Sequence, residues 1–238
     1  DDDLKVGGHQ ASSASVVSIL VVLYFKIINK YDRIAIKPHA SPVFHAIQYL
    51  LDNQNIENLK KFRKLDGAQA YPSKTKDFCD VDFSTGSVGL GGAMTIFSSF
   101  TQDFLKENQL LKNKTSKMIS IFGDAELDEG NIYEALLEGA KHNLKNCWWI
   151  IDYNRQSLDG IVYEKLFEKI INLFELMDWN VEILKYGPKL QKLKKSLSGK
   201  KILKWIDDCP NDLFSALTYQ GGKEWRKALL EVFKEDKE

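Results

Sequence analysis

Short apolar runs alternate along this chain with longer stretches of helical spacing. The short runs have the length of buried strands and cover residues 34–36, 118–122, 147–151 and 179–184. The helical spacing predicts helices over residues 12–29, 42–51, 56–64, 129–142 and 166–177. Strands that alternate with helices form parallel sheets through right-handed crossovers, so the pattern predicts parallel β-α-β units.

The first predicted helix, over residues 12–29, is rich in small and aliphatic residues, so we expect it to be buried on most sides. Its most apolar part, Val16–Ile28, is about thirteen residues long and contains Ser18 and Lys26. A membrane-spanning helix needs roughly 20 apolar residues, and a secretory signal needs a basic leader and a small-residue cleavage site. The pattern therefore predicts a core helix, with no membrane span and no signal peptide.

Two regions fall outside the alternation of strands and helices. Residues 66–85 are rich in turn-forming residues, and a loop of this length is a plausible carrier of function. After residue 188 the chain is lysine-rich and helical in pattern, with a break at Cys209-Pro210. We therefore expect an α/β domain over residues 1–187 and a helical C-terminal extension over residues 188–238.

Composition narrows the class of protein. The 238 residues carry 33 Lys and Arg against 33 Asp and Glu, and 44% are hydrophobic, which is typical of a globular chain. A net charge of zero argues against a dedicated binder of nucleic acid or of a membrane surface. Three scattered cysteines form neither a disulfide framework nor a zinc site, so we expect a reducing, cytoplasmic setting.

Polar side chains with oxygen ligands follow two of the predicted strands. Asp124 comes after the run at 118–122, and Asn154 and Gln156 follow the run at 147–151. Ligands of an open α/β sheet bind beyond the carboxyl ends of its strands, and carboxylate with amide oxygens suits Mg²⁺ or Ca²⁺. Mg²⁺ commonly completes its shell with substrate phosphates, so the pattern points to a metal-bridged phosphate or diphosphate. The alternative, that Asp124 caps a helix and Asn154 shapes a turn, stays open on these residues alone.

A glycine-rich turn, Gly86–Gly92, opens a further predicted helix that extends to about Leu111. Glycines allow close backbone approach, and a helix N-terminus offers free amides to a phosphate. The turn lacks the Gly-Lys-Ser/Thr end of a Walker loop, and Met94 replaces the last glycine of a dinucleotide fingerprint. Taken alone, the turn is better explained by tight helix packing.

Five motifs in chain order resemble those of the thiamine diphosphate-dependent transketolase superfamily, in its transketolase and homodimeric-type pyruvate dehydrogenase branch. Asp124 and Asn154 lie thirty residues apart, within the spacing of the family's Gly-Asp-Gly…Asn motif. The matching segments are Gly7–Ser12, Pro38–Pro42, Ser84–Gly91, Gly123–Gly130 and Asp152–Asn154. The resemblance covers most of the chain and implies a three-layer α/β/α fold with a mainly parallel sheet, the diphosphate-binding domain of such enzymes.

The resemblance also implies roles for individual residues. Asp124, Asn154 and Gln156 would coordinate Mg²⁺, and Gly123, Ala125 and Glu126 would lie beside the diphosphate of thiamine diphosphate. Ser87, Val88 and Gly89 would touch the diphosphate and the aminopyrimidine, largely through backbone. His9 and His39 would face the diphosphate and the substrate, and Glu126 would join a carboxylate network at a dimer interface. The catalytic candidates are therefore His9, His39 and Glu126, whereas His45 and His142 are expected to be structural.

Ala125 departs from the family pattern, which usually has glycine at this position. A methyl group there is tolerable if the residue has a negative φ.

The resemblance favours one reaction and leaves two alternatives. Tyr71-Pro72 and the segment 154–160 resemble pyruvate dehydrogenases, which implies cleavage of a C–C bond in a 2-oxo acid as in the first component of that complex. Segments 84–87 and 126–130 resemble transketolases, which transfer a two-carbon ketol unit between sugar phosphates. A non-catalytic cofactor-binding module is the third alternative. Enzymes of this family also need a carboxylate from a pyrimidine-binding domain, which these 238 residues lack. We therefore expect a partner subunit or a missing C-terminal portion, in a homodimer or heterotetramer.

Overall fold

The computed structural model describes residues 10–111, 116–157, 160–161 and 165–234. The chain divides into two compact units, residues 1–154 and residues 155–238, each described below by itself. The expected boundary between residues 187 and 188 stays a prediction. Within the described ranges, no helix has both the length and the apolar character needed to cross a membrane.

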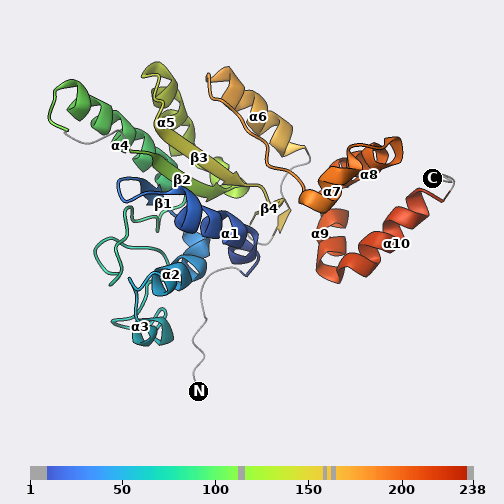
Figure 1. The fold of residues 1–238 in the computed structure, drawn as a ribbon, viewed down its shortest axis with the longest axis horizontal. Coiled ribbons are helices and arrows are strands. Elements are labelled where there is room, and N and C mark those ends of the chain that lie inside the picture. The colour runs from blue at the N-terminus through green and yellow to red at the C-terminus, as the bar shows by residue number, and fades with distance from the viewer. Residues whose placement is uncertain (1–9, 112–115, 158–159, 162–164, 235–238) are drawn as a thin grey trace. The chain divides into compact units, whose positions relative to one another are not determined.

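A parallel three-stranded sheet forms the centre of the first unit (Figure 1). Its strands are β1 (Arg33–Ala35), β2 (Met118–Gly123) and β3 (Cys147–Asp152), in the order β1-β2-β3. In the register of the sheet, Ile34 pairs with Ile119, and Gly123 pairs with Asp152. All three strands therefore end at the same edge, which confirms the α/β class with a parallel sheet.

One face of the sheet packs against α1 (Gln10–Val22) and α2 (Ser41–Leu50), which lie together on one side of it in Figure 1. Side chains alternate between the two faces of a strand, so every second residue of β1 and β2 enters this core. The largest contributors are isoleucines of the strands and aliphatic or aromatic residues of the helices: Ile34, Ile119, Ile121, Val16, Leu20, Phe44 and Ile47.

The opposite face packs against α4 (Leu90–Glu107), which in turn contacts α5 (Gly130–Lys141). A Cβ atom on Gly91 would lie 3.1 Å from Ser120 Oγ and 3.3 Å from Ala35 Cβ. On Gly92 it would lie 3.2 Å from Trp149 Cζ2. The two glycines thus let α4 approach the sheet closely, and helices on both faces complete the three-layer α/β/α arrangement.

Helix α1 is less buried than its composition predicts. It ends at Val22 and continues as a single π-helical turn, Leu23–Ile27. Val16 and Leu20 are fully buried, but Val17, Val21 and Val22 are 41–49% exposed. The expectation of burial on most sides was therefore wrong, because within the described residues the core covers one face of the helix.

Two other expectations need correction. Residues 179–184 alternate like a strand but form none, and Leu184 is 97% exposed. Alternation specifies a strand only where a neighbouring strand pairs with it, and these residues have none in the described part of the chain. The helix expected over 56–64 is also shorter, because α3 (Ile56–Lys60) gives way to a turn in which Arg63 has a φ of 66°.

The second unit is mainly helical. A two-residue antiparallel pair joins β4 (Gln156–Ser157) to β5 (Gly160–Ile161). The predicted break at Cys209-Pro210 is confirmed, because α8 ends and α9 begins there. The helices are α6 (Leu166–Leu176), α7 (Pro188–Leu193), α8 (Leu197–Asp208), α9 (Asn211–Gln220) and α10 (Gly222–Val232).

The irregular segment 66–85 is attached to α2 through the buried imidazole of His45. His45 Nε2 lies 3.0 Å from the carbonyl oxygen of Gln69 and 3.7 Å from Asp77 Oδ1. The carboxylate of Asp77 accepts hydrogen bonds from the backbone amides of Gln69 (2.8 Å) and Ser73 (2.7 Å). His45 and Asp77 together therefore fix the start of this segment on the core.

We predict that the stability of the first unit falls in mild acid through His45. Burial lowers the pKa of His45 below its ordinary value of 6.5, although Asp77 and Gln69 oppose that shift. Below about pH 6.5 the unfolded chain therefore binds a proton that the folded chain resists, so the free energy of unfolding decreases as pH falls. Denaturant titrations between pH 7.5 and 5 measure this slope.

The matched comparison uses His45→Gln and His142→Gln, since His142 is exposed and directly follows the last residue of α5. His45→Gln should flatten the acid slope, and His142→Gln should leave it unchanged. An acid slope that is the same in all three proteins would contradict the role of His45.

Candidate functional site

The carboxyl edge of the sheet gathers most of the predicted polar residues that the structure describes. Asp124 follows β2 and begins a 3₁₀ helix, Asp124–Asp128. Its side chain is almost fully buried (1% exposed), and Oδ1 lies 3.1 Å from the backbone nitrogen of its neighbour Ala125. Because Gly123 pairs with Asp152 in the sheet, Asp124, one residue after Gly123, and Asn154, two residues after Asp152, emerge at the same edge.

The structure describes neither the side chain of the third predicted metal ligand nor the first of the two predicted site histidines. Gln156 begins β4 in the second unit, and its side chain lies outside what the structure describes. His9 also lies outside the described residues. The triad of Asp124, Asn154 and Gln156 therefore stays a prediction.

His39 lies beyond β1 in a short 3₁₀ helix, Pro38–Ala40. Its side chain is half-buried, and its ring centroid lies 5.7 Å from that of Tyr71. Its carbonyl oxygen accepts a hydrogen bond from Ser13 Oγ of α1 (3.3 Å). This position puts His39 at the carboxyl end of β1, on the same edge as Asp124.

Glu126 joins the glycine-rich turn to the end of β2. Its two carboxylate oxygens accept hydrogen bonds from the backbone amides of Gly89 and Gly123, each at 3.0 Å. Burial raises the pKa of Glu126, and the two amide hydrogen bonds and the charge of Lys37 oppose that rise. Both amides would be left without an acceptor if this carboxylate were removed.

The predicted cofactor loop precedes the N-terminus of α4. Ser87 is exposed, Val88 is half-buried and Gly89 is buried. Gly89 has a φ of 82°, and a Cβ atom there would lie 2.7 Å from Glu129 Cβ, so the position requires glycine. The first amides of an α-helix lack partners within the helix and favour an anion. The loop therefore places an 18-residue helix with its positive end beside the Gly89–Glu126 contact.

The structure also reveals a buried ion pair that the sequence patterns did not single out. Lys37 Nζ lies 2.8 Å from Asp152 Oδ2, and both side chains are buried. The same oxygen accepts a 2.5 Å hydrogen bond from Ser15 Oγ of α1. The position of the two residues in the sequence could have indicated the pair. Lys37 and Asp152 each stand at the carboxyl end of an apolar run, where charged residues face a ligand crevice.

The chemistry of this edge suits both a cation and an anion. Asp124, Glu126 and Asp152 are buried there with Lys37, so carboxylates outnumber ammonium groups among the described buried residues of this edge. A carboxylate and an amide oxygen form a hard donor set that suits Mg²⁺. Among the described residues, no three His, Cys, Asp or Glu side chains converge as a metal cluster. A cation here would thus depend on the amide oxygens and on oxygens of its own ligand, while Lys37 and the α4 N-terminus suit an anion.

Ala125 fits the site without backbone strain. It is absent from the described residues that have a positive φ, so its methyl group meets the condition set by the sequence. The departure from glycine at this position therefore gives no backbone argument against a ligand.

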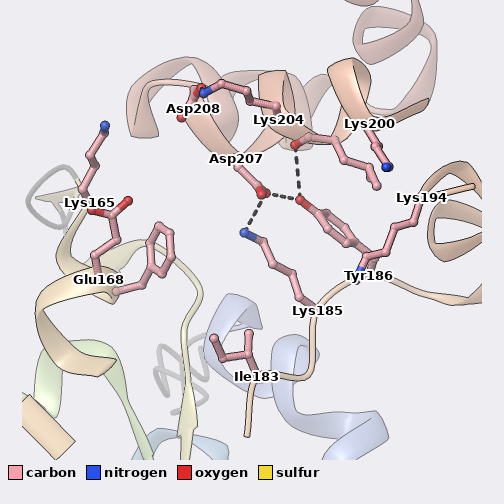
Figure 2. Close-up of a pocket in the computed structure, with 12 residues that line it drawn as sticks. Lys165, Glu168, Ile183, Lys185, Tyr186, Lys194, Lys200, Lys204, Asp207 and Asp208 are labelled. Carbon is pink, nitrogen blue, oxygen red and sulfur yellow. Dashed lines mark hydrogen bonds and ion pairs between the residues drawn. The ribbon is translucent and has the colours of Figure 1, made fainter. Parts of the chain in front are cut away.

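A cavity lies in the second unit and contains none of the predicted site residues (Figure 2). This cavity of about 560 Å³ is lined by α6, α8 and the segment between them. Both of its aspartates are paired with lysines: Lys185 Nζ lies 2.6 Å from Asp207 Oδ1, Tyr186 also bonds Asp207, and Lys204 pairs with Asp208. We therefore take the sheet edge as the candidate site.

The chain resembles known proteins over most of its length. The family described as "Transketolase, thiamine diphosphate binding domain" matches residues 24–205. The chain is 31% identical over 210 residues to the pyruvate dehydrogenase E1 component of Haemophilus influenzae, covering 83% of this chain and 24% of that protein. It is 29% identical over 212 residues to the E1 component of Escherichia coli K12, covering 84% and 24%. The chain thus spans about a quarter of the length of these relatives.

Solved structures share the fold. A transketolase from Leishmania mexicana superposes with a TM-score of 0.64 at 20% identity and covers 87% of this chain and 32% of its own. A transketolase variant from Pichia stipitis gives a TM-score of 0.53 at 23% identity, over 64% of this chain and 23% of its own. At these identities the likeness concerns the fold alone.

We predict that Glu126→Ala destabilises the first unit by about 1–3 kcal/mol, because it leaves two buried backbone amides without an acceptor. Glu126→Gln should cost less, since its single carbonyl oxygen can still accept from one of the two amides. Urea titrations of both variants measure the change. Glu129→Ala, which removes an exposed carboxylate three residues away, is the control. Equal stability of Glu126→Ala and Glu129→Ala would contradict the bridging role.

Proposed function

Because the chain belongs to the transketolase family of thiamine diphosphate-binding domains, we propose that it binds thiamine diphosphate at the carboxyl edge of its sheet. The observation that carries this proposal is the common position of Asp124 and Asn154, which follows from the Gly123–Asp152 register. The N-terminus of α4, with Gly89 held against Glu126, supports a diphosphate next to them.

We further propose that Mg²⁺ joins this chain to the diphosphate. Asp124, Asn154 and Gln156 would hold the ion through one carboxylate and two amide oxygens. The burial of Asp124 at the same sheet edge as Asn154 supports this role. The excess of carboxylates over ammonium groups at this edge supports the same conclusion.

The remaining residues would orient the cofactor and the substrate. Ser87, Val88 and Gly89 would contact the diphosphate and aminopyrimidine through backbone groups, and Gly123 and Ala125 would lie beside the diphosphate. His39, and His9 with it, would hold a proton near substrate oxygens. Glu126 would keep the glycine turn in place and extend a carboxylate network into a dimer interface. When bound, thiamine diphosphate supplies the carbanion chemistry that cleaves a C–C bond beside a carbonyl group.

As the reaction, we propose cleavage of a 2-oxo acid, as in the first component of pyruvate dehydrogenase. The sequence similarity to E1 components supports this choice. The alternative is transfer of a two-carbon ketol unit between sugar phosphates, which the transketolase-like segments 84–87 and 126–130 favour. A non-catalytic cofactor-binding module is the outcome if neither reaction occurs.

The active site would be completed by another polypeptide or by further chain. The chain covers 24% of the E1 components that it resembles, and their remaining length supports a pyrimidine-binding portion elsewhere. We propose a homodimer or heterotetramer in which that portion faces the carboxyl edge. The three free cysteines and the balanced charge support a cytoplasmic location.

We predict that thiamine diphosphate binds this chain in a Mg²⁺-dependent manner and that Asp124→Asn weakens this binding at least about tenfold, because it removes the charged metal ligand. Isothermal calorimetry with and without Mg²⁺ measures the effect. Asp128→Asn is the matched control, since Asp128 is exposed at the end of the same 3₁₀ helix. Equal affinities of the two variants would argue against Asp124 as a ligand.

We also predict that this chain, together with its pyrimidine-binding portion, reduces a dye oxidant when supplied with pyruvate. Turnover of a ketose phosphate with an aldose phosphate acceptor, and none of pyruvate, would favour the transketolase alternative. Absence of both activities from a complex that binds the cofactor would establish the non-catalytic alternative.

A further inference from the structure

We infer that the ammonium group of Lys37 binds the diphosphate directly. The site therefore binds a diphosphate group weakly even in the absence of metal. The inference rests on the proposed function only in taking the anion to be the cofactor's diphosphate. It concerns a residue outside the family motifs that carry the proposed site.

The ammonium group of Lys37 is buried and incompletely bonded. Its side chain is 6% exposed, and its single hydrogen bond to another described residue goes to Asp152 Oδ2 at 2.8 Å. A lysine ammonium carries three N–H donors, so two donors have no acceptor in the described part of the chain. Buried polar hydrogens nearly always find a partner, and these two are thus available to an oxygen-rich ligand or to water.

The ammonium group of Lys37 lies at the carboxyl end of β2, where the diphosphate would bind. A Cβ atom on Gly123 would lie 3.2 Å from Lys37 Cε and 3.3 Å from Lys37 Nζ. Lys37 Nζ thus lies over the end of β2, one residue before Asp124. Its charge is also close enough to Glu126 to oppose the rise in the pKa of that carboxyl group. The ammonium is therefore beside both the proposed metal ligand and the carboxylate that holds the glycine turn.

Asp152 and Ser15 hold Lys37 in this position. Asp152 Oδ2 accepts hydrogen bonds from Lys37 Nζ and from Ser15 Oγ, which joins the ion pair to α1. This makes Asp152 a positioning residue, because it fixes the ammonium without itself being suited to an anion. The negative charge of Asp124 opposes an anion in the absence of metal, so the metal-free affinity should be weak and the metal should add to it.

The test is calorimetry of the chain with inorganic pyrophosphate in EDTA, followed by thiamine diphosphate with Mg²⁺. We expect weak, salt-sensitive binding of pyrophosphate in EDTA, and its loss in Lys37→Gln. We expect Lys37→Gln to weaken binding of thiamine diphosphate with Mg²⁺ about ten- to hundredfold, the range for a lost charge-assisted hydrogen bond.

The matched control is Lys117→Gln. Lys117 Nζ lies 3.6 Å from Asp32 Oδ2 at the opposite, amino end of β2, so it forms a longer and more exposed lysine–aspartate pair away from the site. Removal of one partner of a buried ion pair is strongly destabilising. The double variant Lys37→Met/Asp152→Asn therefore accompanies Lys37→Gln, and urea titrations identify which variants are folded. The double variant should also lose binding of pyrophosphate.

The results separate the inference from the proposed function. Unchanged binding of pyrophosphate by a folded Lys37 variant would overturn the inference, and so would absence of pyrophosphate binding by the unaltered chain in EDTA. Failure of the unaltered chain to bind thiamine diphosphate with Mg²⁺ would instead count against the proposed function. In that case, Lys37-dependent binding of pyrophosphate would still support the anion site.

Discussion

The buried ion pair between Lys37 and Asp152 is the contact on which the carboxyl edge of the sheet depends. It joins the chain beyond β1 to the last residue of β3 across the end of β2, and Ser15 extends it to α1. Two buried charges are tolerated only when they compensate each other in good geometry. The pair therefore holds three segments of the first unit in one arrangement at the place where a ligand would lie.

The hydrogen bonds of Glu126 form a second network, which lies next to the Lys37–Asp152–Ser15 contacts at Gly123. Glu126 accepts hydrogen bonds from the amides of Gly123 and Gly89, and so connects β2 to the turn before α4. The end of the Lys37 side chain also lies beside Gly123, 3.2–3.3 Å from where a Cβ atom of that residue would be. The strand end, the glycine turn and the ion pair consequently form one continuous structure around Asp124.

The sequence predicted the elements that hydrophobic periodicity and chain spacing determine, and missed those that depend on tertiary partners. The run that became β2 was found because a buried parallel strand is apolar on both faces, and Asp124 was found because it follows that run. The run that became β3 has the same apolar composition, although most of its residues are only partly buried. Residues 179–184 have a strand-like pattern without a pairing strand, which the pattern could not show. Lys37 was missed for a similar reason, since its partner Asp152 is 115 residues away and meets it only in the folded chain.

The close packing of α4 on the sheet makes the site sensitive to substitutions in the helix that lie away from the ligand. Gly91 and Gly92 leave no room for a methyl group without movement of a few tenths of an ångström, and the atoms that would be met are Ser120 Oγ, Ala35 Cβ and the ring of Trp149. The helix would respond as a rigid rod, so its first amides would move with it. Substitution of either glycine would thus impair ligand binding, although neither residue faces the ligand and every side chain that does would be unchanged.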